Sequence, residues 1–157
     1  SMIFGLFTLF RLLAINPPEK NMIGNNPEWD EFISTHRWAV LTTVRGSGQP
    51  SSSVVAYARD EDQLVISTPG TTLKRSTIER NPQVTLCIIS NSEPFNFVTI
   101  EATAVVETDN LLENTRRVFA NIADAGWEEP ADLPTWLESQ QRVILKISPQ
   151  RVSAVIR

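Results

Sequence analysis

The chain of 157 residues has few of the residues that build covalent and metal-bound frameworks. It contains one cysteine, Cys87, and one histidine, His36. A single cysteine excludes a disulfide framework within the chain and a zinc site made of cysteines. A single histidine gives little support to a catalytic triad or a histidine-based metal site. This composition is typical of a protein in a reducing compartment, and we expect a cytoplasmic location.

Basic residues are also in the minority. Lysine and arginine number 14 against 18 aspartates and glutamates, which gives a formal net charge of −4 at pH 7. A protein that binds nucleic acid broadly needs a basic face, so this balance argues against that class. Any positively charged site must be local. The length and the 41% hydrophobic content predict one domain with a proper core.

No apolar run is long enough to span a bilayer. Residues 2–15 are strongly apolar, but a membrane-spanning helix needs about 20 such residues, so we expect no stable membrane insertion. The segment has no basic region before it and no clear cleavage site after it, and both absences disfavour a signal peptide. Secretion is therefore only the alternative interpretation. We expect residues 1–26 to be an apolar extension, docked as a helix, and a linker. The folded domain is expected over residues 27–157.

Short apolar segments alternate with turn sequences, which predicts an antiparallel sheet. Strands are expected at residues 38–44, 51–59, 63–67, 84–89, 97–107, 142–149 and 151–156. A proline separates the last two. Asp109 is a good N-cap for an amphipathic helix that follows the long strand. Closure of the sheet would remove its exposed edges, so we predict a mainly β fold with helices at the ends of a small antiparallel barrel.

The most informative stretch leads from a predicted strand into a short helix. The connection over residues 67–72 is Ser-Thr-Pro-Gly-Thr-Thr, and Lys74 and Arg75 follow in the first turn of the helix. Free N–H groups at a helix start, hydroxyl groups and a lysine together favour an anion such as a phosphate. The alternative is that both cations are solvated and that Ser67 or Thr68 only caps the strand end. The combination favours the anion site.

The order of these motifs resembles the split-β-barrel flavin and deazaflavin oxidoreductases, which are relatives of pyridoxamine phosphate oxidase. The segments that carry the resemblance are residues 38–44, 48–50 and 64–68, Lys74, and residues 80–82. Asn121-Ile122-Ala123, a Trp-rich helix and the closing strand at 142–147 look most like the branch that uses coenzyme F420. The resemblance covers about residues 28–157.

The resemblance implies a homodimer of FMN-binding split-barrel type, with a cofactor in each of two grooves between the barrels. The phosphate-binding lysine of the family falls at Lys74. Residues implied to bind the cofactor are Ser52, Ser53, Val54, Val55, Ser67, Thr68, Thr72, Leu73, Lys74 and Arg75. Leu73 stands where the pyridoxamine phosphate oxidases have an arginine, and residues 52–55 lack the cations of their cofactor strand. These departures favour F420 over FMN, and Arg75 partly compensates by reaching the phosphate or the acidic tail of F420.

The implied activity is a reductase that transfers a hydride from the reduced deazaflavin to a small unsaturated or aromatic acceptor. The cofactor performs this chemistry while the protein binds and orients it, so we assign no catalytic side chain. Tyr57, Phe95 and Phe97 are candidates for the substrate groove, with core packing as the alternative for each. An FMN-dependent reductase or oxidase of the same fold is the second interpretation. A non-catalytic carrier of a flavin-like cofactor or a tetrapyrrole is the third.

Overall fold

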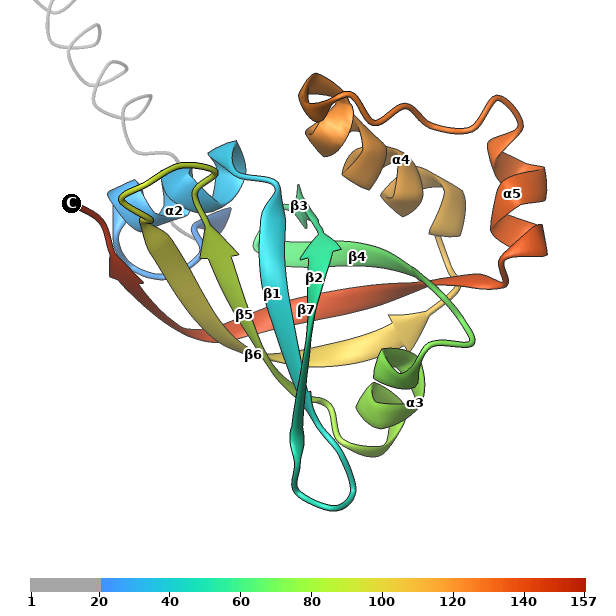
Figure 1. Ribbon diagram of the computed structural model, residues 1–157, viewed down its shortest axis with the longest axis horizontal. Helices are drawn as coiled ribbons and strands as arrows, with labels where there is room; N and C mark the ends of the chain where they lie inside the picture. The colour runs from blue at the N-terminus through green and yellow to red at the C-terminus, as the bar shows by residue number, and fades with distance from the viewer. Residues whose placement is uncertain (1–20) are drawn as a thin grey trace, which may run out of the picture.

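The computed structural model describes residues 21–157, whose strands form one curled antiparallel sheet (Figure 1). The strand order is β2-β1-β5-β6-β7-β4-β3, and every neighbouring pair is antiparallel. The strands are β1 Trp38–Val44, β2 Pro50–Ala56, β3 Ala58–Asp60, β4 Gln63–Pro69, β5 Gln83–Ile89, β6 Phe97–Glu107 and β7 Arg142–Val155. The predicted mainly β split barrel is confirmed.

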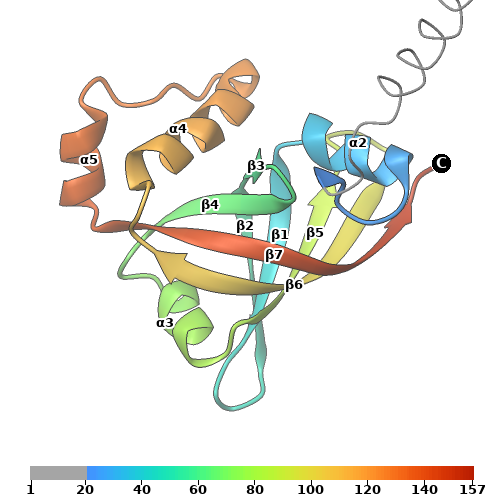
Figure 2. The same ribbon diagram turned by 180° about the vertical axis from the view of Figure 1, so that it is seen from behind.

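Helices cover the sheet at several places. In the described chain they are α2 Pro27–Thr35, α3 Leu73–Arg80, α4 Leu111–Ile122, the 3-10 turn η2 Ala123–Ala125 and α5 Leu133–Ser139. In both views α2 lies near the C-terminus, and α4 lies above β4 with α5 beside it (Figures 1 and 2). At the bottom of Figures 1 and 2, α3 lies next to the β1–β2 hairpin. None of the described helices is long and apolar enough to cross a membrane.

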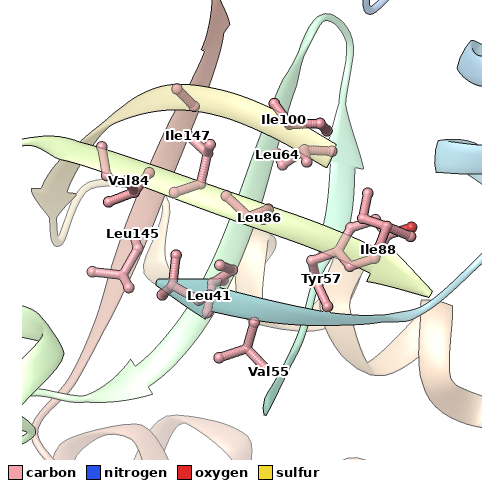
Figure 3. Packing of buried hydrophobic residues seen from close by; sticks show 14 of the residues in the cluster. Leu41, Val55, Tyr57, Leu64, Val84, Leu86, Ile88, Ile100, Leu145 and Ile147 are labelled. Atoms are coloured by element: carbon pink, nitrogen blue, oxygen red, sulfur yellow. The ribbon is translucent and has the colours of Figure 1, made fainter. Parts of the chain in front are cut away.

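The core fills the inside of the curl (Figure 3). Alternate residues of β1, β5 and β6 are buried, among them Leu41, Leu86 and Ile100, because successive side chains of a strand point to opposite faces. Tyr57 is also fully buried, and its hydroxyl group donates a hydrogen bond of 2.6 Å to the carbonyl oxygen of Ile33. A smaller cluster packs beneath α4 and consists of Ala58, Val65, Val118 and Ile144.

The return strand that we expected over residues 51–59 is interrupted at Tyr57. The N–H of Tyr57 donates to the carbonyl oxygen of Arg37 at 3.2 Å, outside the ladder of β2 and β1. The residues after Tyr57 form β3, which pairs with β4. The interruption lets one stretch of sequence supply both edges of the sheet, β2 and β3.

Two further boundaries differ from the prediction. Pro149 does not end β7, because the pairing with β6 shifts between Glu101 and Ala102 and so accommodates Gln150 as a bulge. β7 is therefore one strand instead of two. The cap of α4 is one residue later than expected, at Asn110, whose backbone has a positive φ of 56° and which makes no side-chain cap hydrogen bond.

Residues 21–25, which we assigned to the linker, pack against the domain. Ile23 is 1% exposed and belongs to the main core cluster, and its N–H donates to Oδ1 of Asp30 at 2.8 Å. Arg59 donates to the carbonyl oxygen of Asn21 at 2.6 Å and forms an ion pair with Asp30 at 2.7 Å. The packed part of the chain therefore begins before residue 27. The expected docking helix falls within residues 1–20, outside the described residues.

Candidate functional site

The expected anion site lies where β4 runs into α3. The N–H of Gly70 donates to the carbonyl oxygen of Gln141 at 2.7 Å, and an added Cβ at this position would overlap the same oxygen. Nη1 of Arg75 donates to the carbonyl oxygen of Gly70 at 3.2 Å. On the neighbouring strand, Pro69 pairs with Arg142 at the start of β7. These contacts tie the β4–α3 connection to β7, and the close approach requires glycine at position 70.

The first turn of α3 lacks a side-chain cap. Thr72 occupies the N-cap position, but its hydroxyl group donates to the carbonyl oxygen of Pro69 at 3.0 Å instead of accepting from the helix. The turn also contains no acid. By contrast, the side chain of Asn26 caps α2, whose first turn carries two acids. The uncapped N–H groups and the positive end of the dipole of α3 both favour an anion.

Lys74 and Arg142 bring two positive charges to this place. Burial lowers the pKa of Lys74, and the charge of Arg142 lowers it further. Burial also lowers the pKa of Arg142. Within residues 21–157, neither side chain forms an ion pair. Two cations in this arrangement repel each other, and a bound anion would relieve that repulsion.

Sequence reasoning missed Arg142. The only sequence signal was a basic residue at the start of the last strand, far along the chain from Lys74. The pairing of β4 with β7 places Arg142 opposite Pro69, at the end of β4 that leads into α3, where its charge acts on Lys74. Periodicity within either strand carries no information about that pairing, because it reports which residues share a face and not which strands are neighbours.

The hydroxyl groups of the connection do not all face the same way. Ser67 lies on the side of β4 that faces α4, and its Oγ accepts from Oγ1 of Thr115 at 3.2 Å. Thr68 points to the other side and is buried, with its Oγ1 at 3.5 Å from Oγ1 of Thr72. Of the two strand-end candidates, Thr68 is therefore the one whose hydroxyl group lies near the start of α3.

Arg75 is engaged in contacts within the chain, whereas the side chain of Leu73 is exposed. Nε of Arg75 forms an ion pair of 2.9 Å with Glu79, and its Nη1 is bound to the carbonyl oxygen of Gly70. Arg75 thus holds the connection in place through contacts within the chain. Leu73, the first residue of α3, is 47% exposed.

The candidates on β2 lie on two faces of an edge strand. Val55 and Ser53 point toward the core side, whereas Ser52 and Val54 point outward. Val54 is 70% exposed, and Oγ of Ser52 lies 2.8 Å from Oγ1 of Thr42 on β1. This outer surface presents apolar and hydroxyl groups without a charge.

The three substrate-groove candidates do not join the anion site within one chain. Tyr57 is a core residue: its side chain is buried, its hydroxyl group is hydrogen-bonded, and burial raises its pKa. Phe97 begins β6 and Phe95 precedes it, at the end of the sheet near α2 and the C-terminus (Figure 2). Nη1 of Arg157 donates to the carbonyl oxygen of Phe95, which is 48% exposed. The burial of Tyr57 agrees with core packing, the alternative to a place in the groove.

A metal site is not indicated by the described residues, where no group of three or more His, Cys, Asp or Glu side chains is suitably placed. The donors gathered at the β4–α3 connection are instead N–H groups and cations, which suit an oxyanion.

The family model described as pyridoxamine 5'-phosphate oxidase matches residues 26–156. The chain belongs to this family. The family includes oxidoreductases. No curated protein shows significant sequence similarity to the chain.

Solved structures share the fold. A putative pyridoxamine 5'-phosphate oxidase from Listeria innocua is 25% identical, with a TM-score of 0.60 over 80% of this chain and 93% of that one. An F420 reductase is 20% identical, with a TM-score of 0.67 over 82% of this chain and 98% of that one. A FAD-binding protein from Mesorhizobium loti is 18% identical, with a TM-score of 0.63 over 83% and 93%.

Proposed function

We propose that this member of the pyridoxamine 5'-phosphate oxidase family is an F420-dependent reductase. It transfers a hydride from the reduced deazaflavin to a small unsaturated or aromatic acceptor. The observation that carries the proposal is Lys74, a half-buried cation without an ion-pair partner among the described residues, in the uncapped first turn of α3. A phosphate on the ligand satisfies the charge, the helix dipole and the free N–H groups at once.

The choice of F420 over FMN rests on how little positive charge surrounds the rest of the site. Leu73 is apolar, Arg75 is paired with Glu79, and the outer face of β2 offers Ser52 and Val54. The similarity of the fold to an F420 reductase supports this choice. FMN is the alternative cofactor.

The residues of this chain have a limited task in the proposed reaction. The deazaflavin, when bound, supplies the hydride. Lys74 and the start of α3 hold its phosphate, and the outer face of β2 contacts its ring system. The protein orients the ring toward the acceptor and excludes water, so the contribution of the chain is positioning.

We also propose a homodimer, in which a second copy covers the outer face of the sheet. Exposed apolar side chains lie on β2 and near the ends of β6 and β7; they are Val54, Phe95 and Val155. In such a dimer, Phe95 and Phe97 of one copy wall the groove next to Lys74 of the other. Sedimentation velocity should give the mass of two chains, and a monomer at micromolar concentration would contradict the arrangement. The lone Cys87 agrees with a cytoplasmic location.

The deciding experiment is a titration of the apo-protein with F420 and with FMN at the same salt concentration. Lys74→Ala should weaken cofactor binding by about 1.5–3 kcal/mol, the value of a charge-assisted hydrogen bond. Arg80→Ala removes an exposed cation from the last turn of the same helix and should change affinity by less than about 0.5 kcal/mol.

Each outcome of this titration has a definite meaning. An unchanged dissociation constant for folded Lys74→Ala would return Lys74 to a solvated surface role. Tight FMN binding without F420 binding would establish the FMN-dependent alternative. Binding of either cofactor without hydride transfer to any acceptor in a broad screen would indicate a carrier, and a tetrapyrrole would then be the next ligand to titrate.

A further inference from the structure

Arg142 occupies a fixed place beside the connection that leads from β4 into α3. It begins β7 and pairs with Pro69, and the neighbouring Gln141 accepts the hydrogen bond from Gly70. Backbone contacts of the sheet and of the β4–α3 connection therefore hold the backbone of Arg142 next to this connection. Its position does not depend on the conformation of a flexible surface loop.

An aromatic side chain orients the guanidinium group of Arg142. Its Cζ lies 4.2 Å from the ring centroid of Trp136 on α5, in a cation–π contact. Trp136 is itself held edge-on against Phe119 of α4, with ring centroids 5.7 Å apart. Stacking uses one face of the planar guanidinium and leaves the N–H donors around its rim for other partners.

Those donors lack an acceptor in the described structure. Nε of Arg142 is buried and has no hydrogen-bond partner. A buried donor without a partner costs free energy, since it has lost its water and gained nothing in exchange. Other half-buried cations are satisfied: Arg59 pairs with Asp30, and Lys146 pairs with Asp60.

Arg142 is also within reach of a ligand. It lies at a groove of about 450 Å³ between α4 and α5, whose lining is mostly apolar and comprises Leu111, Leu112, Pro134, Leu137, Glu138 and Gln141. Glu138 is the only acid of this lining, and it forms no ion pair with Arg142 in the described chain. The cation is thus open on one side and unneutralised.

We propose that Arg142, held by Trp136, is a second anion-binding cation that shares one phosphate group with Lys74 and the N-terminus of α3. Arg142 contacts the phosphate directly, and Trp136 is a positioning residue that acts through it. The ligand class is a phosphate ester, and inorganic phosphate alone should also bind. The assignment deepens the proposed function and rests on it only for the identity of the molecule that carries the phosphate.

The first test measures the binding of inorganic phosphate to the full chain by isothermal titration calorimetry. Arg142→Gln should weaken phosphate binding about 10- to 100-fold, the loss expected for a charged hydrogen-bonding partner. Arg142→Lys should recover part of the affinity, because a lysine keeps the charge but loses the planar donor set. Arg116→Gln removes an exposed arginine of α4 and should leave the affinity unchanged.

The positioning role of Trp136 needs its own measurement. Trp136→Leu keeps both cations and should weaken phosphate binding less than Arg142→Gln does. In the double variant Trp136→Leu/Arg142→Gln, the Trp136 substitution should add no further loss, since it acts only through Arg142. Losses that multiply would show that Trp136 acts independently of Arg142. Circular dichroism and thermal unfolding establish that each variant is folded.

A second probe separates this inference from the proposed function. Arg142→Gln should lose affinity for the phosphorylated cofactor but bind its dephosphorylated counterpart, riboflavin or the phosphate-free deazaflavin, as the wild type does. Equal phosphate affinity in wild type and Arg142→Gln would overturn the inference even if F420 reduction is established. Loss of phosphate binding in the variant, with no F420 or FMN binding in the wild type, would overturn the proposed function and leave the inference intact. If Arg142→Gln does not fold, Arg142→Lys decides: phosphate affinity equal to the wild type contradicts the inference.

Discussion

Replacement of Gly70 by alanine tests how closely the β4–α3 connection is held against β7. The added Cβ would lie 2.8 Å from Nη1 of Arg75 and closer still to the carbonyl oxygen of Gln141, whereas real Cβ atoms essentially never approach within 3.0 Å. The arginine side chain can move aside. The carbonyl oxygen belongs to the backbone, so the connection itself must shift.

The expected loss of stability follows from these contacts. The shift breaks the 2.7 Å hydrogen bond from Gly70 to Gln141, which contributes about 0.5–1.5 kcal/mol. Steric overpacking adds about 1–3 kcal/mol. The smaller conformational entropy of alanine in the unfolded chain offsets about 0.4–1 kcal/mol. We expect a net loss of about 0.5–4 kcal/mol in the free energy of unfolding, which lowers the Tm by about 2–4 °C per kcal/mol in a domain of this size.

The assay is urea unfolding monitored by circular dichroism, and phosphate affinity is measured on the same samples. Gly46→Ala is the matched control, because the nearest atom to its added Cβ is Nη1 of Arg80 at 4.0 Å. We expect this control to stay within about 0.5 kcal/mol of the wild type. Gly70→Ala should also bind phosphate more weakly, since it displaces α3 from Arg142. Equal stability and equal phosphate affinity in the two variants would refute the reasoning.

Two further predictions concern the core. Tyr57 is the only tyrosine, and burial raises its pKa above the ordinary value of 10.0, so the folded protein should show no tyrosinate absorbance near pH 10.0. Because the neutral form is favoured in the folded state, this residue leaves stability unchanged below pH 10.0 and reduces it above that pH by about 1.4 kcal/mol per pH unit. Tyr57→Phe should abolish this pH dependence. At neutral pH it should lower the free energy of unfolding by about 1–3 kcal/mol, since the carbonyl group of Ile33 loses its donor. Ordinary tyrosinate titration in the folded protein would contradict the burial. Ile23→Ala should cost about 2–5 kcal/mol, as for a core aliphatic residue, against less than about 0.5 kcal/mol for the exposed Asn25→Ala. Equal stability of these two variants would place residues 21–25 outside the folded domain.

The sequence by itself determined most of the strands and indicated the connection into α3 as the candidate anion site. The expected bounds of β1, Trp38–Val44, and of β6, Phe97–Glu107, agree with the structure, because alternating burial and turn residues are local properties of the chain. The same holds for the hydroxyl-rich connection into α3, whose residues are contiguous. Family membership followed from the order of these local motifs.

Only the tertiary structure decided which distant residues meet. Arg142 lies beside the connection that leads to Lys74 because β4 pairs with β7, and a strand's own sequence does not specify its neighbour. Tyr57 lies in the core because the chain breaks between β2 and β3, and Arg75 is occupied because Gly70 and Glu79 lie within its reach. These outcomes depend on how the sheet curls and closes, which is a property of long-range packing and therefore leaves no local pattern in the sequence.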